Sequence, residues 1–179
     1  MTIFGKPSLP DFVVIGAQKC ATTSLLAYIG QHSRIRLGFK KATHYFDRHH
    51  AKSVNWYARQ FPAAPSSLWG KTRDWLTGES CPAYMFLPEV PQRMSTIMPQ
   101  VRLIAIVRDP VKRLVSQYGH EKRKGRVDTD FAGYVEQSIG MDWPTTGTLP
   151  FVLQQAAVPR GFYADQFNGI YELSPLKLC

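Results

Sequence analysis

Several features that would place this chain in a special class of protein are missing from its sequence. No apolar run approaches the roughly 20 residues that a helix needs to cross a bilayer, and the first residues contain no signal-peptide core. The three cysteines show neither a paired spacing nor a Cys-x-x-Cys zinc pattern. We therefore expect a soluble globular protein without a disulfide framework.

Acidic residues are also scarce. The 179 residues include 22 basic and 13 acidic side chains, which gives a formal net charge of +9. This balance favours an anionic partner, but by itself it does not choose among a nucleotide, a sulfated glycan, a nucleic acid and a membrane surface. The length favours one domain, with residues 1–10 as a flexible leader and 11–179 as a single folded unit.

Both common glycine motifs for nucleotides are absent. Neither Gly-x-x-x-x-Gly-Lys-Ser/Thr nor Gly-x-Gly-x-x-Gly occurs, and Lys19 precedes the small residues Cys20 and Ala21 instead of following a glycine. Nevertheless, residues 11–24 pass from an apolar strand through a turn containing Lys19 into the hydroxyl residues 22–24. This order predicts an anion site at a helix N-terminus. The simpler interpretation is a strand, turn and helix with a surface lysine.

A second segment, residues 102–118, has a similar organisation. The apolar run 103–107 predicts a buried parallel strand, which Arg108 closes. Asp109 is a good helix N-cap, and Pro110 suits the first turn of the helix that follows. An arginine at a strand end and Ser116 on the next helix predict a clamp for a phosphate dianion.

Strands that alternate with helices predict a three-layer α/β/α fold with a central parallel sheet. In such sheets ligands bind at the carboxyl ends of the strands, where both segments fall. The expected strands lie at 12–15, 35–37, 71–78, 103–107 and from 174 on; the expected helices lie at 22–29, 53–60, 90–98, 110–124, 131–139 and 150–173, the last broken near 159–161.

These segments together resemble the sulfotransferases that use 3′-phosphoadenosine 5′-phosphosulfate (PAPS). The pattern Lys-x-x-Thr-Thr-Ser from Lys19 resembles their 5′-phosphosulfate loop, and Arg108 with Ser116 resembles their 3′-phosphate motif. Residues 44–47, 79–84 and 160–166 are similar to further segments of the heparan-sulfate-type and bacterial carbohydrate branch. The resemblance implies the P-loop-NTPase-like sulfotransferase fold.

The resemblance also implies a function. The chain would transfer a sulfuryl group from PAPS to a hydroxyl or amine of a carbohydrate or other small acceptor, without a metal and without a nucleic-acid partner. Lys19 would stabilise the leaving phosphate oxygen. The location would be cytoplasmic for a complete bacterial-type protein, or the Golgi lumen for a domain of an anchored enzyme. The implied donor-binding residues are Gln18, Lys19, Cys20, Ala21, Thr22, Thr23, Ser24, Arg108 and Ser116.

The sequence departs from the family pattern in three places. Ala42 stands where the carbohydrate branch commonly has a glutamate that accepts the acceptor's proton. Three interpretations remain open: His44 is the base, the base lies elsewhere, or the chain is weakly active or inactive. Ala21 stands where glycine is frequent. The family also usually continues beyond residue 179 with a closing segment, which implies a fragment or a natural short form.

Three other functions are consistent with parts of the sequence. A non-catalytic protein that binds PAPS or its product would explain Ala42. A P-loop kinase or nucleotidase is disfavoured by the position of Lys19 and by the absence of an acidic Mg²⁺ ligand after a strand, since Asp109 is expected to cap a helix. A nucleic-acid binder would explain the net charge but not the order of the motifs.

Overall fold

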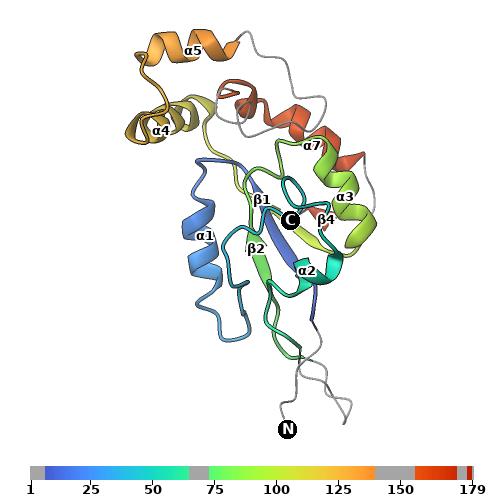
Figure 1. The fold of residues 1–179 in the computed structure, drawn as a ribbon. Coiled ribbons are helices and arrows are strands. Elements are labelled where there is room, and N and C mark those ends of the chain that lie inside the picture. The colour runs from blue at the N-terminus through green and yellow to red at the C-terminus, as the bar shows by residue number, and fades with distance from the viewer. Residues whose placement is uncertain (1–6, 65–72, 140–155, 173–176, 179) are drawn as a thin grey trace.

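A parallel sheet forms the centre of the computed structural model, which describes residues 7–64, 73–139, 156–172 and 177–178. The strand order is β2-β1-β3-β4, and every neighbouring pair is parallel (Figure 1). The strands are β1 (Phe12–Gly16), β2 (Gly78–Ser80), β3 (Arg102–Ala105) and β4 (Lys177–Leu178). The expected parallel sheet is therefore confirmed.

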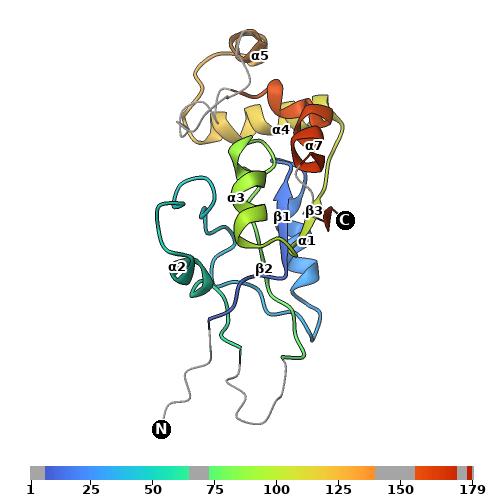
Figure 2. The ribbon, with the colours of Figure 1, turned by 90° about the vertical axis from the view of Figure 1, so that its right-hand side faces the viewer.

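Helices cover both faces of this sheet. Helix α1 lies on one face, whereas α3 and α7 lie on the opposite face (Figures 1 and 2). Among the described helices, none combines the length and the apolar character that a bilayer crossing requires. The helices are α1 (Thr22–Ile29), α2 (Val54–Ala58), α3 (Glu89–Ile97), α4 (Pro110–Arg123), α5 (Phe131–Ile139), the 3-10 turn η1 (Pro159–Gly161) and α7 (Tyr163–Tyr171).

The alternation of side chains along β1 explains the three layers. Phe12 and Val14 pack with Leu26 of α1, whereas Val13 and Ile15 belong to a larger cluster that includes Met94 of α3. All five β1 residues are buried, as expected for a strand that is covered on both faces. The chain therefore has the predicted three-layer α/β/α architecture.

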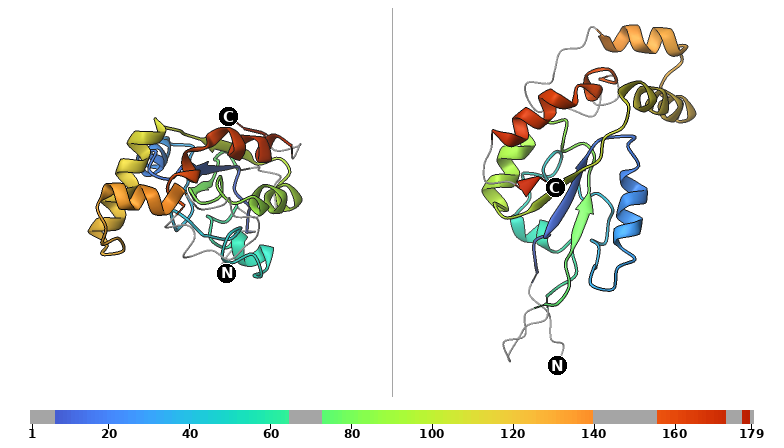
Figure 3. Two further views of the ribbon diagram at one scale, coloured as in Figure 1. Left: turned by 90° about the horizontal axis from the view of Figure 1, so that it is seen from above. Right: turned by 180° about the vertical axis from the view of Figure 1, so that it is seen from behind.

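Backbone hydrogen bonds join the ends of the two central strands. The N–H of Ala17 donates to the carbonyl of Ile106 at 2.8 Å, and the N–H of Ile106 donates to Gly16 at 2.9 Å. These bonds place the turn after β1 beside the segment that leads into α4. Helix α4 lies across this end of the sheet, as the views from above and behind show (Figure 3). The two candidate anion-binding segments are therefore neighbours in space.

Some element boundaries differ from expectation. Strand β2 begins at Gly78, because its pairing with β1 starts opposite Phe12, and β3 ends at Ala105, short of the expected 107. Residues 35–37 form only an isolated bridge, from Ile35 to Leu76. The expected leader lies partly outside the described residues, but Leu9 packs against the larger core cluster. The start of the expected helix 150–173 also lies outside them.

Candidate functional site

A cavity of about 650 Å³ lies at the carboxyl ends of the strands. Segments far apart in the sequence meet here: the turn after β1, the loop before α2, the turn after β2, helix α4 and η1. Lys19 and the pair Arg108 and Ser116 open into this one cavity. Its lining residues are Gln18, Lys19, Ala21, Thr22, Thr23, Lys41, His44, Arg48, Pro82, Ala83, Arg108, Ser116, His120, Glu121, Lys124, Arg126 and Arg160.

The turn after β1 has an unusual backbone. Lys19 and Ala21 have φ values of 66° and 61°, in the left-handed region that favours glycine. Helix α1 begins directly afterwards at Thr22, so the unpaired N–H groups of its first turn lie beside the cavity. Lys41, which the sequence analysis did not select, donates from Nζ to Thr23 Oγ1. The turn after β1 and Lys41 from the loop before α2 therefore bring two ammonium groups to one helix N-terminus.

The electrostatic surroundings of Lys19 are strongly positive. Burial lowers the pKa of its ammonium group, and the charge of Arg123 lowers it further, whereas Glu121 opposes the shift. Burial and then the charge of Lys19 also lower the pKa of His120. A bound anion would stabilise these clustered positive groups, because its negative charge offsets their mutual repulsion.

The segment after β3 forms the predicted helix start. Asp109 caps α4, its side chain accepting from the N–H of Lys112 at 2.8 Å, and Pro110 occupies the first turn. Arg108 precedes this cap, and Ser116 lies on the helix that follows, so the backbone sets the positions of both side chains. Both line the cavity, as the sequence predicted for a phosphate clamp.

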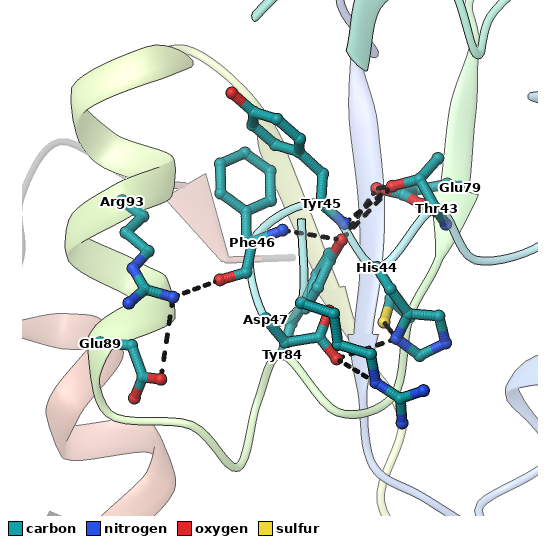
Figure 4. A network of polar contacts seen from close by, with 11 residues as sticks. Thr43, His44, Tyr45, Phe46, Asp47, Glu79, Tyr84, Glu89 and Arg93 are labelled. Carbon is teal, nitrogen blue, oxygen red and sulfur yellow. Dashed lines mark hydrogen bonds and ion pairs between the residues drawn. The ribbon is translucent and has the colours of Figure 1, made fainter. Parts of the chain in front are cut away.

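His44 is held on the other side of the cavity by an aspartate. Its Nδ1 lies 2.8 Å from Asp47 Oδ2, and the Asp47 side chain is only 2% exposed (Figure 4). With Nδ1 as the donor, Nε2 is the unprotonated nitrogen of the neutral ring. The backbone of His44 has a φ of 54°, again in the left-handed region. This arrangement is suited to accepting a proton.

Glu79 anchors the backbone next to His44. Its carboxylate accepts from the N–H of Thr43 at 2.7 Å and from the hydroxyl of Tyr84 at 3.4 Å (Figure 4). The hydroxyl of Tyr57 also donates to this carboxylate, at 2.8 Å. Burial raises the pKa of Glu79, although these hydrogen bonds oppose the shift. Because Glu79 does not line the cavity, its contacts indicate a role in positioning residues 43–46.

One group of side chains near His44 has the atoms of a metal site. His44 Nδ1, a carboxylate oxygen of Asp47 and Cys81 Sγ all lie within 4.8 Å of one another. Burial raises the pKa of the Cys81 thiol well above its usual value, so it is protonated near neutrality. The positive charges of Lys41 and Arg48 nearby also oppose a divalent cation. The geometry is better explained as an aspartate that orients a histidine.

The structure separates the predicted site residues into two groups. His44 and seven of the nine expected donor-binding residues line the cavity, whereas Cys20 and Ser24 do not. Cys20 is buried, with Sγ 3.6 Å from the hydroxyl of Tyr163, and Ser24 is exposed on the first turn of α1. The lining residues that the sequence analysis did not select are Lys41, Arg48, Pro82, Ala83, His120, Glu121, Lys124, Arg126 and Arg160.

Comparisons with known proteins agree with this architecture. No protein-family model matches the chain. It is 38% identical over 110 residues, 62% of its length, to a membrane-associated sulfotransferase, kil1, of Dictyostelium discoideum. It is 34% identical over 114 residues, 64% of its length, to human heparan sulfate glucosamine 3-O-sulfotransferase 3B1. These matches span only 22% and 27% of the two relatives.

A solved structure extends the similarity to most of the chain. The crystal structure of a sulfotransferase from Alicyclobacillus acidocaldarius superposes with a TM-score of 0.73. It covers 96% of this chain and 73% of the other, at 23% sequence identity. At that level of identity, the superposition establishes a shared fold.

Proposed function

We propose that this chain is a member of the sulfotransferase family and that it transfers a sulfuryl group from PAPS to a hydroxyl or amine of a carbohydrate or other small acceptor. The observation that carries the proposal is the shared cavity: Lys19 lines it together with Arg108 and Ser116. A donor with one phosphate near each group could contact both at once. If the Lys19 turn and the Arg108–Ser116 pair opened onto different faces of the protein, they could not both contact one such molecule.

The charge of the cavity supports an anionic donor. Its lining contains seven lysine and arginine side chains but, among the described residues, only one carboxylate, Glu121. That carboxylate already pairs with Arg126, at 3.1 Å. Sulfuryl transfer, like phosphoryl transfer, is accelerated mainly by positioning and by preorganised positive charge on the developing oxyanions. In this proposal Lys19 stabilises the leaving phosphate oxygen.

His44 is the proposed general base. Nε2 would accept the acceptor's proton, and Asp47, bonded to Nδ1, would orient the ring and stabilise its protonated form. Ala42, which stands where a glutamate is common in the carbohydrate branch, packs against the larger core cluster. A weakly active or inactive homologue that only binds the nucleotide is the alternative, which the comparisons do not favour.

Nucleotide binding provides the first test. We expect adenosine 3′,5′-bisphosphate to bind at least about tenfold more tightly than AMP, because a charge-assisted phosphate contact contributes about 1.5–3 kcal/mol. Arg108→Ala should remove most of this preference while affecting AMP little. Isothermal titration calorimetry measures both affinities. Equal binding of the two nucleotides by the unmodified protein would refute the 3′-phosphate site.

Transfer of labelled sulfate from PAPS to a panel of acceptors provides the second test. We expect His44→Asn to lower the rate by about 10²- to 10⁴-fold, the usual contribution of a general base. Asparagine is the matched replacement because it tolerates the left-handed backbone of His44. Bisphosphate affinity should stay within a few fold, which controls for folding. An unchanged rate would show that the base is another group.

A further inference from the structure

Arg160 differs from the other cations that line the cavity. Its residue is only 4% exposed, whereas Lys41, Arg48, Arg108, Lys124 and Arg126 are all exposed. Within the described part of the chain, Nε has no hydrogen-bond partner and no carboxylate forms an ion pair with the guanidinium. The arginine is therefore buried at the cavity wall without a compensating anion.

The surroundings of Arg160 offset little of the free-energy cost of burying its charge. The guanidinium carbon lies 4.4 Å from the centre of the Phe86 ring, so a cation–π contact supplies part of the compensation. Burial, and then repulsion from Arg113, lower the pKa of Arg160 to about 9. Glu121 attracts it, but that carboxylate lies 3.1 Å from Arg126 and 3.9 Å from His120. An unpaired charge in such a position is normally costly.

A second buried arginine shows what a structural role looks like in this fold. Arg113 donates to Gln117 Oε1 at 2.6 Å and to the carbonyl of Ala157, and it does not line the cavity. Two nitrogens of Arg113 thus have internal acceptors, although among the described residues its Nε, like that of Arg160, has none. Arg160, by contrast, has its backbone carbonyl fixed by Gln166 Nε2 at 3.2 Å while its side chain borders the cavity.

We propose that Arg160 is an anion-binding residue of the cavity, and that its guanidinium binds a phosphate or sulfonate group of the bound ligand. A planar guanidinium can donate two parallel hydrogen bonds to such a tetrahedral oxyanion, which an ammonium group cannot. The identity of the ligand rests on the proposed sulfotransferase function, but the anion site itself does not. The anionic group belongs either to the donor nucleotide or to the acceptor, which is the second substrate.

The test compares the unmodified protein with Arg160→Met, which keeps a long apolar side chain over Phe86 but removes the charge. Without ligand, we expect its melting temperature to be equal or higher, because an uncompensated buried charge is lost. If Arg160 had a structural role instead, its replacement would lower the melting temperature. The affinity for the anion should fall by about 10- to 100-fold, which is the loss expected when a charge-assisted hydrogen bond is removed. The control variant is Arg59→Met, which makes the same change in net charge at an exposed position outside the cavity.

Two ligands separate the possible sources of the anion. If the donor supplies it, Arg160→Met weakens binding of adenosine 3′,5′-bisphosphate. If the second substrate supplies it, bisphosphate affinity is retained. In saturating bisphosphate, inorganic sulfate should then stabilise the unmodified protein thermally but not Arg160→Met. Retention of both would overturn the inference. Should far-UV circular dichroism show that Arg160→Met is unfolded, the same criteria apply to Arg160→Gln, which also removes the charge.

The outcomes also distinguish this inference from the proposed function. If the unmodified protein prefers the bisphosphate to AMP while Arg160→Met binds every anion normally, the function stands and the role of Arg160 is refuted. If instead Arg160→Met loses sulfate binding while the unmodified protein does not distinguish the two nucleotides, the anion site stands and the PAPS proposal is refuted.

Discussion

Three residues that line the cavity have a backbone in the left-handed region. They are Lys19, Ala21 and His44, with φ values of 66°, 61° and 54°. For residues with a Cβ, this conformation costs about 1–2 kcal/mol each. It persists where the surrounding structure enforces it, and such positions concentrate at functional sites. The sequence suggested one of them, because Ala21 stands where glycine is frequent in similar proteins. For Lys19 and His44, nothing in the residue type predicted the conformation.

Ala21 allows this strain to be measured. We expect Ala21→Gly to raise the free energy of unfolding by up to about 1 kcal/mol, because glycine adopts a positive φ without a Cβ clash. Ala27→Gly, on an exposed position of α1, is the matched control and should lower it by about 1 kcal/mol. Urea denaturation measures both. Destabilisation of similar size in both variants would show that Ala21 is not strained.

The turn after β1 depends on close packing as well as on backbone conformation. A Cβ on Gly16, the last residue of β1, would lie 2.6 Å from Met85 Cβ and 2.7 Å from Met85 Sδ. Met85 is buried, so it has little room to move. This contact couples the turn after β1 to the turn after β2, which carries Pro82 and Ala83 of the cavity wall. The sequence showed a glycine at the turn but not the methionine that requires it.

We predict opposite effects of two glycine-to-alanine changes. Gly16→Ala should lower the free energy of unfolding by about 1–3 kcal/mol, the usual cost of overpacking a core. Gly169→Ala, on α7 with no atom within 4 Å of the added Cβ, should raise it by about 0.5–1 kcal/mol. Thermal and urea denaturation test both. A neutral Gly16→Ala would mean that Met85 moves aside freely.

Positive charge is concentrated around the cavity rather than spread evenly. The whole chain carries a formal charge of +9, and the cavity lining alone contributes seven cations and one carboxylate among the described residues. Because several of these side chains are exposed, their attraction for a ligand acts partly through solvent and is open to screening. The net charge predicted an anionic ligand, but only the folded chain gathers these side chains into one place.

Ligand affinity should therefore depend strongly on salt. We expect the dissociation constant of adenosine 3′,5′-bisphosphate to rise steadily between about 0.1 M and 1 M sodium chloride, as the screening length falls from about 10 Å to about 3 Å. AMP, with fewer charges, should show a shallower dependence. Calorimetry at several salt concentrations measures both slopes. A bisphosphate affinity that does not change with salt would contradict an electrostatic site.

The order of the elements, the three layers and both candidate anion-binding segments could be predicted from the amino-acid sequence, because strand periodicity, the Asp109-Pro110 helix start and the Lys19 turn are local patterns. The precise limits of β2 and β3 were not, since strand pairing sets them. Nor could the sequence predict that Glu79 anchors residues 43–46, that Asp47 orients His44, or that the buried Arg160 lines the cavity. These properties arise from contacts between distant segments, and only the tertiary structure brings them together.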